Sequence, residues 1–390
     1  MVPSAIMRVT GLKTYLFQPP DAKTACFLKI DTDEGVFGWG EAYTLTGREQ
    51  TLERLVQDLG AFLIGRDPFQ IKHFMHAMWR DLSIKRGGFD FYCALSGIEI
   101  AMWDIVGKAL NTPVYNLLGG ACRERLHVYG QPSGPRGDGS LEDLARRAKH
   151  TIDSGHDAIK FDPFPGAWRM HVDKSVERTA IERVRTVREA VGPDVDILIE
   201  VHRRLAPMHA IRVAQAIEQY NPYWYEEPTP AEDIAATAYV RTKTTIPIVL
   251  GEAHSTRAEF REVFERQAAD IINPDICLVG GLLEMRDIAS AAEVYSVALA
   301  PHGNNSTTIG LAASLQVAAC VPNFLIMEYP VAWEPYAKEI SVKPLLPTNG
   351  TIPLPTGPGL GLELDEASLA KYPYKGGRPR TLAVPADEWP

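Results

Sequence analysis

The sequence predicts an α/β protein in which a (β/α) barrel follows a smaller α+β module. Two observations support this prediction. Strand-like and helix-like segments alternate strictly between residues 126 and 330, whereas residues 1–125 place their strands before their helices. The length of 390 residues accommodates one large barrel, an accessory module and a final segment at 331–390.

The first module begins with a predicted antiparallel hairpin. Cys26–Thr32 alternates well enough for a strand, Asp33–Gly35 is a turn sequence, and Val36–Trp39 supplies the second strand. Two helices are predicted after the hairpin, at Gln50–Leu63 and Tyr92–Ala109, because their apolar residues recur at helical spacing. Strands followed by helices indicate an α+β module.

The second module contains eight short apolar runs that we interpret as strands. They are His127–Gly130, Ala158–Phe161, Ile197–Glu200, Tyr223–Glu226, Pro247–Gly251, Ile271–Asn273, Ala298–Pro301 and Phe324–Met327. Helical periodicity fills the intervals, as in Met208–Gln219 and Leu282–Ser296. Eight strands in roughly 200 residues favour a closed barrel. A doubly wound sheet stays open on periodicity alone, although no Gly-x-Gly-x-x-Gly sequence follows a strand.

The final segment, residues 331–390, is rich in proline and glycine and ends in a hydrophilic tail. We expect it to form a strap with a few strands that packs back on the N-terminal module. The predicted boundaries of the three parts therefore fall near residues 125 and 330.

Composition and charge exclude several classes of protein. With 45% hydrophobic and 23% charged residues the chain can bury a large core, and no stretch reaches the roughly 20 continuous apolar residues that a membrane span requires. The formal net charge of −9, from 40 basic and 49 acidic residues, argues against a nucleic-acid partner. A site for a small molecule is favoured instead.

The cysteines and the N-terminus indicate a reducing compartment. The five cysteines lie far apart and form no Cys-x-x-Cys pair, so neither a disulfide framework nor a zinc site is predicted. Residues 1–15 lack the apolar stretch of a signal peptide. We therefore expect a cytoplasmic protein.

Carboxylates recur at the ends of the predicted barrel strands. Glu200, Glu226 and Glu252 end three successive strands, at intervals of 26 residues. Side chains at the carboxyl ends of neighbouring barrel strands point into one mouth, so we expect the three carboxylates to converge. Clustered negative charges require a counter-ion, and oxygen ligands select a hard cation such as Mg²⁺. The sequence therefore predicts a magnesium site.

Two alternative roles for these glutamates stay open. Each could cap the helix after its strand or pair with an arginine. Alternatively, two barrel carboxylates act as acid and as nucleophile or base in a metal-free glycosidase. The third glutamate and the nearby histidines weigh against a glycosidase.

The later strands add a candidate general base. Asp275 follows the sixth strand, His302 ends the seventh and Glu328 ends the eighth, at intervals of 27 and 26 residues. A carboxylate bonded to one imidazole nitrogen fixes the tautomer and raises the basicity of the other nitrogen. We therefore predict that Asp275 orients His302 as a base, although a lone histidine is more often structural.

Two further candidates precede this pair in the chain. Lys160 ends the second strand, and His202 lies two residues beyond Glu200. Period-two alternation places His202 on the same side as Glu200, so its side chain can face the cavity. The alternatives are a salt bridge from Lys160 to Asp162 or to a metal-site glutamate, and a structural role in a loop for His202.

Together these residues resemble the enolase superfamily, mandelate racemase subgroup, and within it the acid-sugar dehydratases. The motifs are Glu200–Leu205 (EVHRRL), Glu226-Glu227-Pro228, Gly251-Glu252, Pro274-Asp275 and Pro301-His302. The resemblance covers nearly the whole chain. It implies a modified TIM barrel of (β/α)7β form, with an N-terminal α+β capping domain that the C-terminal segment completes. It also implies Mg²⁺ on the three glutamates and, at Glu328, an acid that hydrogen-bonds the substrate carboxylate.

Two departures from related enzymes bear on the reaction. Racemases of this group carry Lys-x-Lys on the second strand, whereas Lys160-Phe161-Asp162 places an acid at the second position, which disfavours two-sided proton exchange. Mannonate dehydratase resembles the chain around Glu200–Leu205 and in the tail at 370–374, but that group lacks the Asp275–His302 pair. The resemblance therefore favours a galactonate or gluconate type of substrate.

The resemblance predicts a hydro-lyase that removes water from a sugar acid. His302 would take the C2 proton to give an ene-diolate, and His202 would protonate the departing 3-hydroxyl, which yields a 2-keto-3-deoxy acid. Lys160 would supply positive charge near the substrate carboxylate or the leaving group. The alternatives are a racemase, epimerase or lactone cycloisomerase that uses the same ene-diolate, and a catalytically silent binding protein on the same scaffold.

The expected partners are few. We expect a small sugar acid as substrate, no nucleic acid, no membrane, and a homo-oligomer between a dimer and an octamer. Loops at Thr44–Gly47 and Arg86–Gly88 are expected to close over the sugar tail.

Overall fold

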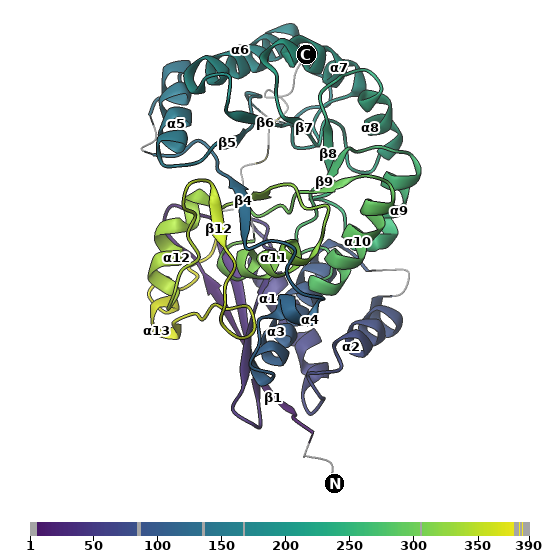
Figure 1. Ribbon diagram of the computed structural model, residues 1–390, viewed down its shortest axis with the longest axis vertical. Coiled ribbons are helices and arrows are strands. Elements are labelled where there is room, and N and C mark those ends of the chain that lie inside the picture. Colours follow the sequence, from purple (N-terminus) through teal and green to yellow (C-terminus); the bar gives the residue numbers. More distant parts are fainter. Residues whose placement is uncertain are drawn as a thin grey trace.

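The structure is a computed structural model that describes residues 6–83, 87–134, 137–166, 168–304, 306–377, 382 and 384. Figure 1 shows two packed units, a ring of helices around a central set of strands and a smaller unit of long strands and helices beside it. The ring is the barrel, and we call the smaller unit, which precedes residue 125, the cap. Among the described residues, no helix has the length and apolar character needed to cross a membrane.

The cap begins with a three-stranded antiparallel sheet. Its strands are β1 (Val9–Phe17), β2 (Ala25–Thr32) and β3 (Phe37–Ala42), in that order across the sheet. The predicted hairpin is confirmed as β2 and β3. β1 has no clear signal in the sequence, because buried and exposed residues do not alternate along it.

Helices pack on this sheet. α1 (Glu49–Gly60) runs into the 3₁₀ turn η1 (Ala61–Leu63), and α3 (Phe89–Ala109) is the long helix, so both predicted helices are confirmed. The remaining cap helices are α2 (Ile71–Met78), the π-helical turn η2 (Trp79–Ser83) and α4 (Val114–Leu117).

Glycines allow β3 to approach α3 closely. A Cβ atom on Gly38 would lie 2.1 Å from the carbonyl oxygen of Ala101, and one on Gly40 would lie 2.0 Å from that of Gly97. A residue with a side chain does not fit at either position, so the two glycines fix β3 against the helix. This contact also fixes the next residue of the strand, Glu41.

Within the described residues the barrel has eight strands, which close into a ring. They are β4 (Arg125–Tyr129), β5 (Ala158–Phe161), β6 (Asp196–Glu200), β7 (Trp224–Glu226), β8 (Ile248–Leu250), β9 (Ile271–Ile272), β10 (Ala298–Leu299) and β11 (Met327–Glu328). β5 to β10 form one parallel sheet, and β11 pairs parallel with β4. The bridges Gly130–Ile159 and Leu299–Phe324 close the two remaining gaps. The predicted barrel is confirmed, and an open doubly wound sheet is excluded.

Helices connect the strands in (β/α)7β order. They are α5 (Leu141–Asp153), α6 (Lys174–Val191), α7 (Pro207–Ile217) with the turn η3 (Glu218–Tyr220), α8 (Ile234–Arg241), α9 (Thr256–Glu265), α10 (Leu282–Val294) and α11 (Thr308–Cys320). Figure 1 shows α11 between the barrel strands and the cap. The eighth strand differs from its predicted range of Phe324–Met327, because Phe324 makes a single bridge and the ladder with β4 starts at Met327.

The final segment contacts both units. It contains η4 (Val331–Trp333), α12 (Glu334–Ile340), β12 (Thr351–Pro353) and α13 (Glu366–Leu369). It reaches the cap where Phe17 of β1 bridges Pro373 and packs its ring against Trp333 and Tyr372. The expected packing on the cap is therefore observed, but the expected few strands are not. In the described part of this segment the one named strand is β12, which pairs antiparallel with β4 of the barrel.

Candidate active site

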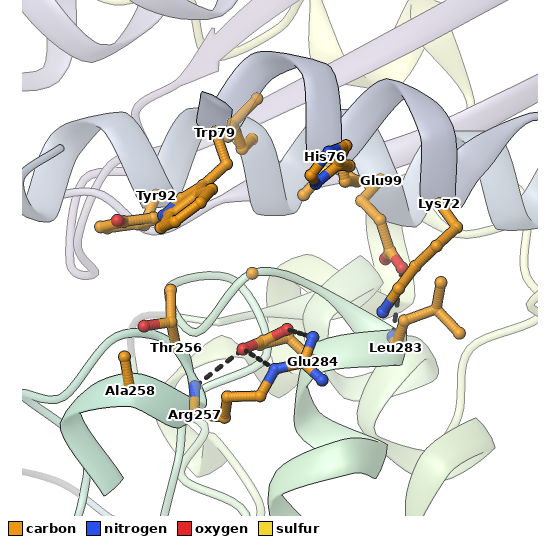
Figure 2. Close-up of a pocket in the computed structure, with 13 residues that line it drawn as sticks. Lys72, His76, Trp79, Tyr92, Glu99, Thr256, Arg257, Ala258, Leu283 and Glu284 are labelled. Atoms are coloured by element: carbon orange, nitrogen blue, oxygen red, sulfur yellow. Dashed lines mark hydrogen bonds and ion pairs between the residues drawn. The ribbon is translucent and has the colours of Figure 1, made fainter. Parts of the chain in front are cut away.

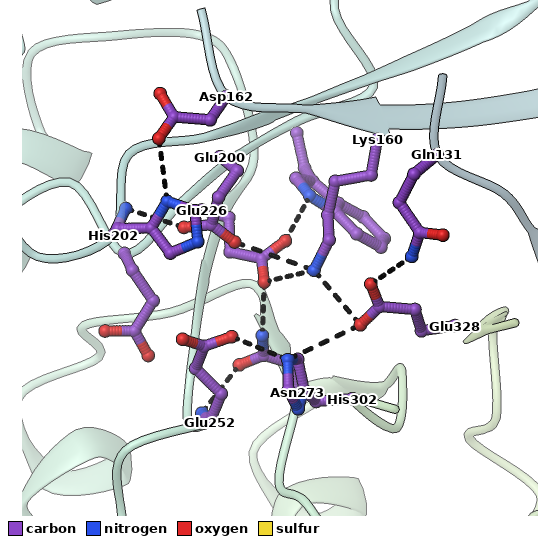
Figure 3. A network of polar contacts seen from close by, with 12 residues as sticks. Gln131, Lys160, Asp162, Glu200, His202, Glu226, Glu252, Asn273, His302 and Glu328 are labelled. Carbon is purple, nitrogen blue, oxygen red and sulfur yellow. Dashed lines mark hydrogen bonds and ion pairs between the residues drawn. The ribbon is translucent and has the colours of Figure 1, made fainter. Parts of the chain in front are cut away.

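Three glutamates meet at the carboxyl ends of consecutive barrel strands. Glu200 ends β6, Glu226 ends β7, and Glu252 lies two residues beyond β8. One carboxylate oxygen of each residue lies within 4.8 Å of the others, and all three side chains are buried (Figure 3). The convergence expected from the 26-residue spacing is therefore observed.

The buried cluster disfavours the charged form of two of its three glutamates. Burial, and then the charge of Glu252, raise the pKa of Glu200 to about 7. Burial and the charge of Glu200 raise the pKa of Glu226 well above its usual value. In the described part of the chain, the buried Oε2 of Glu200 has no hydrogen-bond partner. A buried set of carboxylates that includes an oxygen without a hydrogen bond fits a hard divalent cation, which Glu200, Glu226 and Glu252 would hold.

Neighbouring side chains hold Glu226 in place. Nε1 of Trp224 donates to Oε2 at 2.9 Å, and Nδ2 of Asn273 donates to Oε1 at 2.7 Å. Oδ1 of Asn273 also accepts the backbone N–H of Glu252 at 3.2 Å, so this side chain links two glutamates. Sequence reasoning missed Asn273 as a site residue, although it ends a predicted strand, the same signal that identified the glutamates.

His302 and Asp275 form a buried pair at the next two strand ends. Nδ1 of His302 lies 2.7 Å from Oδ2 of Asp275. Nε2 lies 3.0 Å from Oε2 of Glu252 and 3.5 Å from Oε2 of Glu328. Burial by itself lowers the pKa of His302, but the charges of Glu252 and Glu328 outweigh burial and raise it well above its usual value. Asp275 therefore fixes Nδ1 as the N–H nitrogen, and Nε2 faces the glutamate cluster.

Lys160 forms ion pairs with the same cluster. Its Nζ lies 2.8 Å from Oε1 of Glu226, 3.3 Å from Oε2 of Glu328 and 3.6 Å from Oε2 of Glu200. Of the two salt bridges that the sequence left open for Lys160, the one to the metal-site glutamates is observed. Asp162 instead has other partners, described below.

Glu328 is held as a carboxylate by several donors. Besides Lys160, the backbone N–H of Gly303 donates to it at 3.1 Å and the side-chain amide of Gln131 donates to its other oxygen. Burial raises the pKa of Glu328, but the charges of Lys160 and His302 outweigh burial and lower it below its usual value. Gln131 is a second site residue that sequence reasoning missed, although it directly follows the first predicted barrel strand.

His202 lies beside Glu200, but strand alternation does not place it there. β6 ends at Glu200, and the φ angles of His202 and Arg203 are 55° and 59°, in the left-handed region. This turn directs the backbone N–H of His202 to Oε1 of Glu200 at 2.6 Å. The alternation argument is therefore wrong, because strand geometry stops before His202.

The loop after β5 supplies two contacts to the His202 ring. Nδ1 of His202 lies 2.9 Å from Oδ2 of Asp162, and the indole of Trp168 stacks on the imidazole with ring centroids 5.1 Å apart. Arg204 pairs with the same Asp162, and its guanidinium lies 5.4 Å from the Trp168 ring centroid. The acid at the position where racemases carry a second lysine is thus the partner of His202.

Arg203 is a further cation of the site that sequence reasoning missed. Its guanidinium pairs with Oε1 of Glu252 and lies 3.7 Å from Oε2 of Glu227. Because Arg203 stands in a turn rather than at a strand end, the spacing of strand ends gives no signal for it. Its charge offsets part of the negative charge of the cluster.

The loops expected over a sugar tail are described in part. The segment 44–47 starts beside the site, since the ring of the preceding residue, Tyr43, lies 6.2 Å from the His302 ring. Arg86 lies outside the described residues, and Gly87 and Gly88 are exposed before α3.

A separate cavity of about 300 Å³ lies between α2 and α3 of the cap and the first turns of α9 and α10 (Figure 2). Lys72, Trp79, Tyr92 and Arg257 are among its lining residues. No residue of the predicted site lines it, so the chemistry of the strand ends belongs to the barrel mouth and not to this cavity.

Family comparisons agree with this geometry. Residues 18–119 match the N-terminal domain of mandelate racemase and muconate lactonizing enzyme, and residues 143–368 match the enolase C-terminal domain-like family. The chain is a member of the enolase superfamily. The resemblance predicted from the strand-end motifs is therefore confirmed, as is the capped barrel fold.

Individual members of the superfamily are similar over most of their length. A protein named D-galactonate dehydratase family member, from Streptomyces bingchenggensis, is 35% identical over 371 residues, which are 89% of either chain. The D-gluconate dehydratase of Thermoproteus tenax is 32% identical over 96% of this chain and 74% of its own. A crystal structure of a mandelate racemase/muconate lactonizing enzyme from Sulfitobacter superposes with a TM-score of 0.87 at 32% identity, covering 95% of this chain and 96% of that one.

Proposed function

We propose that the chain is a Mg²⁺-dependent dehydratase of a sugar acid of galactonate or gluconate type. The observation that carries the proposal is a pair of aspartate-bound imidazoles, those of His302 and His202, on different sides of the three glutamates (Figure 3). Elimination of water needs a base for one proton and an acid for the departing hydroxyl, and the two imidazoles suit these tasks. The names of similar superfamily members support the substrate type.

The proposed reaction begins with His302. Asp275 holds the proton of Nδ1, so that Nε2 is the nitrogen that removes the C2 proton of the substrate. The negative charge of Glu252 raises the pKa of His302. If Glu252 were a metal ligand, this charge would be offset and the pKa of His302 would be raised less. Bound Mg²⁺ would supply positive charge against the negative charge that develops on the substrate carboxylate.

The second proton comes from His202 in this proposal. Its Nδ1 is held by Asp162, which leaves Nε2 to donate a proton to the departing 3-hydroxyl. The hydroxyl leaves as water, the C2–C3 enol remains, and its tautomerisation gives a 2-keto-3-deoxy acid. Trp168 stacks on one face of the His202 ring and limits its orientation.

Lys160 is unsuited to be the second base of a racemase or epimerase. Burial lowers the pKa of its ammonium group, but the charges of Glu226 and Glu328 outweigh burial and raise it well above its usual value. An ammonium ion between two carboxylates has no lone pair to accept a proton. In this proposal Lys160 adds positive charge near the substrate carboxylate, and dehydration is favoured over epimerisation because Asp162, the partner of His202, stands where racemases carry a second lysine.

A panel of aldonic and aldaric acids incubated with the protein and Mg²⁺ tests the proposal. We expect formation of a 2-keto acid from a galactonate or gluconate type of substrate, and loss of the activity on addition of EDTA. The same incubation in D₂O separates the alternatives. Return of intact acid with deuterium at C2 would identify an epimerase, and Mg²⁺ binding without turnover of any acid would identify a silent binding protein.

A further inference from the structure

Glu41, a residue of the cap, is buried against the barrel. Its Oε1 accepts hydrogen bonds from the backbone N–H and the hydroxyl of Thr307 at 2.7 and 2.6 Å, and its Oε2 accepts from the N–H of Gly310 at 2.8 Å. These donors belong to the start of α11, where the side chain of Thr307 does not cap its own helix. A carboxylate from another domain therefore satisfies the free N–H groups of this helix.

The start of α11 also contacts the candidate base. The hydroxyl of Ser306 donates to Oδ1 of Asp275, which also accepts the backbone N–H of Cys277 at 2.9 Å. The other carboxylate oxygen of Asp275 faces Nδ1 of His302. A continuous set of contacts thus leads from Glu41 through Thr307 and the adjacent Ser306 to the Asp275–His302 pair.

The same end of β3 makes a second approach to this pair. The backbone N–H of Tyr43 donates to the carbonyl oxygen of Cys277 at 3.2 Å, and the Tyr43 ring lies 6.2 Å from the His302 ring at an interplanar angle of 39°. β3 itself is fixed against α3 by Gly38 and Gly40. The cap thus approaches both Asp275 and His302 through β3 and the residue that follows it.

We propose that Glu41 is a positioning residue for His302. Through Glu41, the packing of the cap against the barrel determines the orientation of the base. This inference rests on the proposed function, because it assigns a source of orientation to the base of that reaction. Without Glu41 the first turn of α11 loses its acceptors, and Ser306 is no longer held against Asp275. Asp275 then has fewer bonds to fix its carboxylate, and the imidazole that it orients deviates from the geometry needed at C2.

Glu99 provides a matched control from the same domain. This residue of α3 is also fully buried and accepts backbone N–H groups at the start of a barrel helix, from Leu282 at 2.8 Å and Leu283 at 3.1 Å. Figure 2 shows its carboxylate directed at Leu283 of α10. Its remaining hydrogen bond in the described part of the chain comes from Trp103, and none of its partners hydrogen-bonds the carboxylate of Asp275 or the ring of His302. The two glutamates differ in the helix that they cap.

The test compares Glu41→Gln, Ser306→Ala and Glu99→Gln with the unmodified protein. For each protein, C2 hydrogen exchange in D₂O, kcat and KM for 2-keto acid formation, Mg²⁺ affinity by calorimetry and the Tm are measured. We expect Glu41→Gln and Ser306→Ala to lower kcat and the exchange rate by about tenfold to a hundredfold, with KM and Mg²⁺ affinity within about twofold. Glu99→Gln is expected to lower the Tm as Glu41→Gln does and to keep its kcat.

The double variant Glu41→Gln/Ser306→Ala tests whether both residues act through Asp275. Both changes act through Asp275, so we expect the double variant to be no slower than the slower single variant, whereas independent effects would multiply. Equal kcat values in Glu41→Gln and Glu99→Gln would overturn the inference. If Glu41→Gln does not fold, Ser306→Ala decides, because it keeps the bonds of Glu41, and an unchanged kcat in it overturns the inference. Failure of the unmodified protein to exchange or dehydrate any acid would instead refute the proposed function.

Discussion

Nδ1 of His302 lies 2.7 Å from Oδ2 of Asp275, and the two residues are also joined by a parallel backbone bridge. Both side chains are buried, at 4% and 0% exposure, so the imidazole has little freedom to rotate. The bridge aligns the ends of neighbouring strands, and the hydrogen bond then sets the tautomer. The candidate base is thus fixed by the barrel backbone as well as by its partner side chain.

Replacement of His302 by Asn tests this base directly. Asn has no side-chain nitrogen that accepts a proton at neutral pH, so we expect C2 exchange and dehydration to fall by at least about a hundredfold. The three glutamates remain, so Mg²⁺ affinity measured by calorimetry is expected to change little. Full exchange activity in His302→Asn would show that another group removes the proton.

His202→Asn separates the second proton transfer from the first. The hydrogen bonds of His202 within the described residues go to Asp162 and Glu200, and neither Asp275 nor His302 takes part in them. We therefore expect the variant to exchange the C2 hydrogen in D₂O while 2-keto acid formation falls by at least about a hundredfold. Loss of exchange and dehydration to the same extent would show that His202 acts before or during proton abstraction.

Asp162→Ala removes the partner of His202 without touching its ring. The stacked indole of Trp168 remains, but Nδ1 of His202 loses its hydrogen-bond acceptor at 2.9 Å. The imidazole can then rotate about its Cβ–Cγ bond. We expect dehydration to slow by about tenfold or more while C2 exchange is retained. Rates of both reactions in one D₂O incubation, followed by NMR, measure the difference. Equal rates in Asp162→Ala and the unmodified protein would assign the aspartate to its other partners, Arg204 and the backbone N–H of Phe164.

Mg²⁺ is expected to raise the Tm, and EDTA to reverse the increase. Like charges in the buried cluster destabilise the metal-free folded state, and an ion that binds only the folded state adds about 2.7 kcal/mol at a concentration a hundredfold above its Kd. Glu200→Gln removes one ligand and one charge, so its metal-free Tm is expected to rise while its response to Mg²⁺ weakens. An identical Mg²⁺ response in this variant would exclude Glu200 as a ligand.

The spacing of strand ends predicted most of the site because a barrel repeats one strand and one helix. Glu200, Glu226 and Glu252 recur at one repeat length, and each repeat returns the chain to the same mouth. Asn273 and Gln131 carry the same signal, a polar residue at or just after a predicted strand. An amide side chain by itself does not indicate a catalytic or metal-binding role, so these two residues were not selected. Residues in the regular part of the fold could therefore be predicted.

Turn geometry and contacts between domains could not be predicted from the repeat. The backbone turn at His202 and Arg203 is left-handed, and alternation along a strand carries no information about it. The contact of Glu41 with Thr307 joins positions 266 residues apart in different domains. A local sequence pattern does not predict such a contact, because the contact depends on how the folded cap packs against the folded barrel. The range predicted for the eighth strand was wrong for a similar reason, since its ladder forms with β4, a neighbour in the barrel that lies far earlier in the sequence.

Glu99 predicts a pH dependence of stability. Burial raises its pKa from 4.5 to about 7, so between these values the folded protein retains a proton that the unfolded chain has released. The unfolded state then binds fewer protons, and the free energy of unfolding falls as the pH rises from about 4.5 to about 7. Glu99→Gln lacks this titration, so the Tm of the unmodified protein relative to the variant is expected to fall across that window. Thermal melts from pH 5 to 8 at saturating Mg²⁺, which keeps the active-site carboxylates engaged, measure the difference. A difference in Tm that stays constant over this range would show that Glu99 titrates near its usual value.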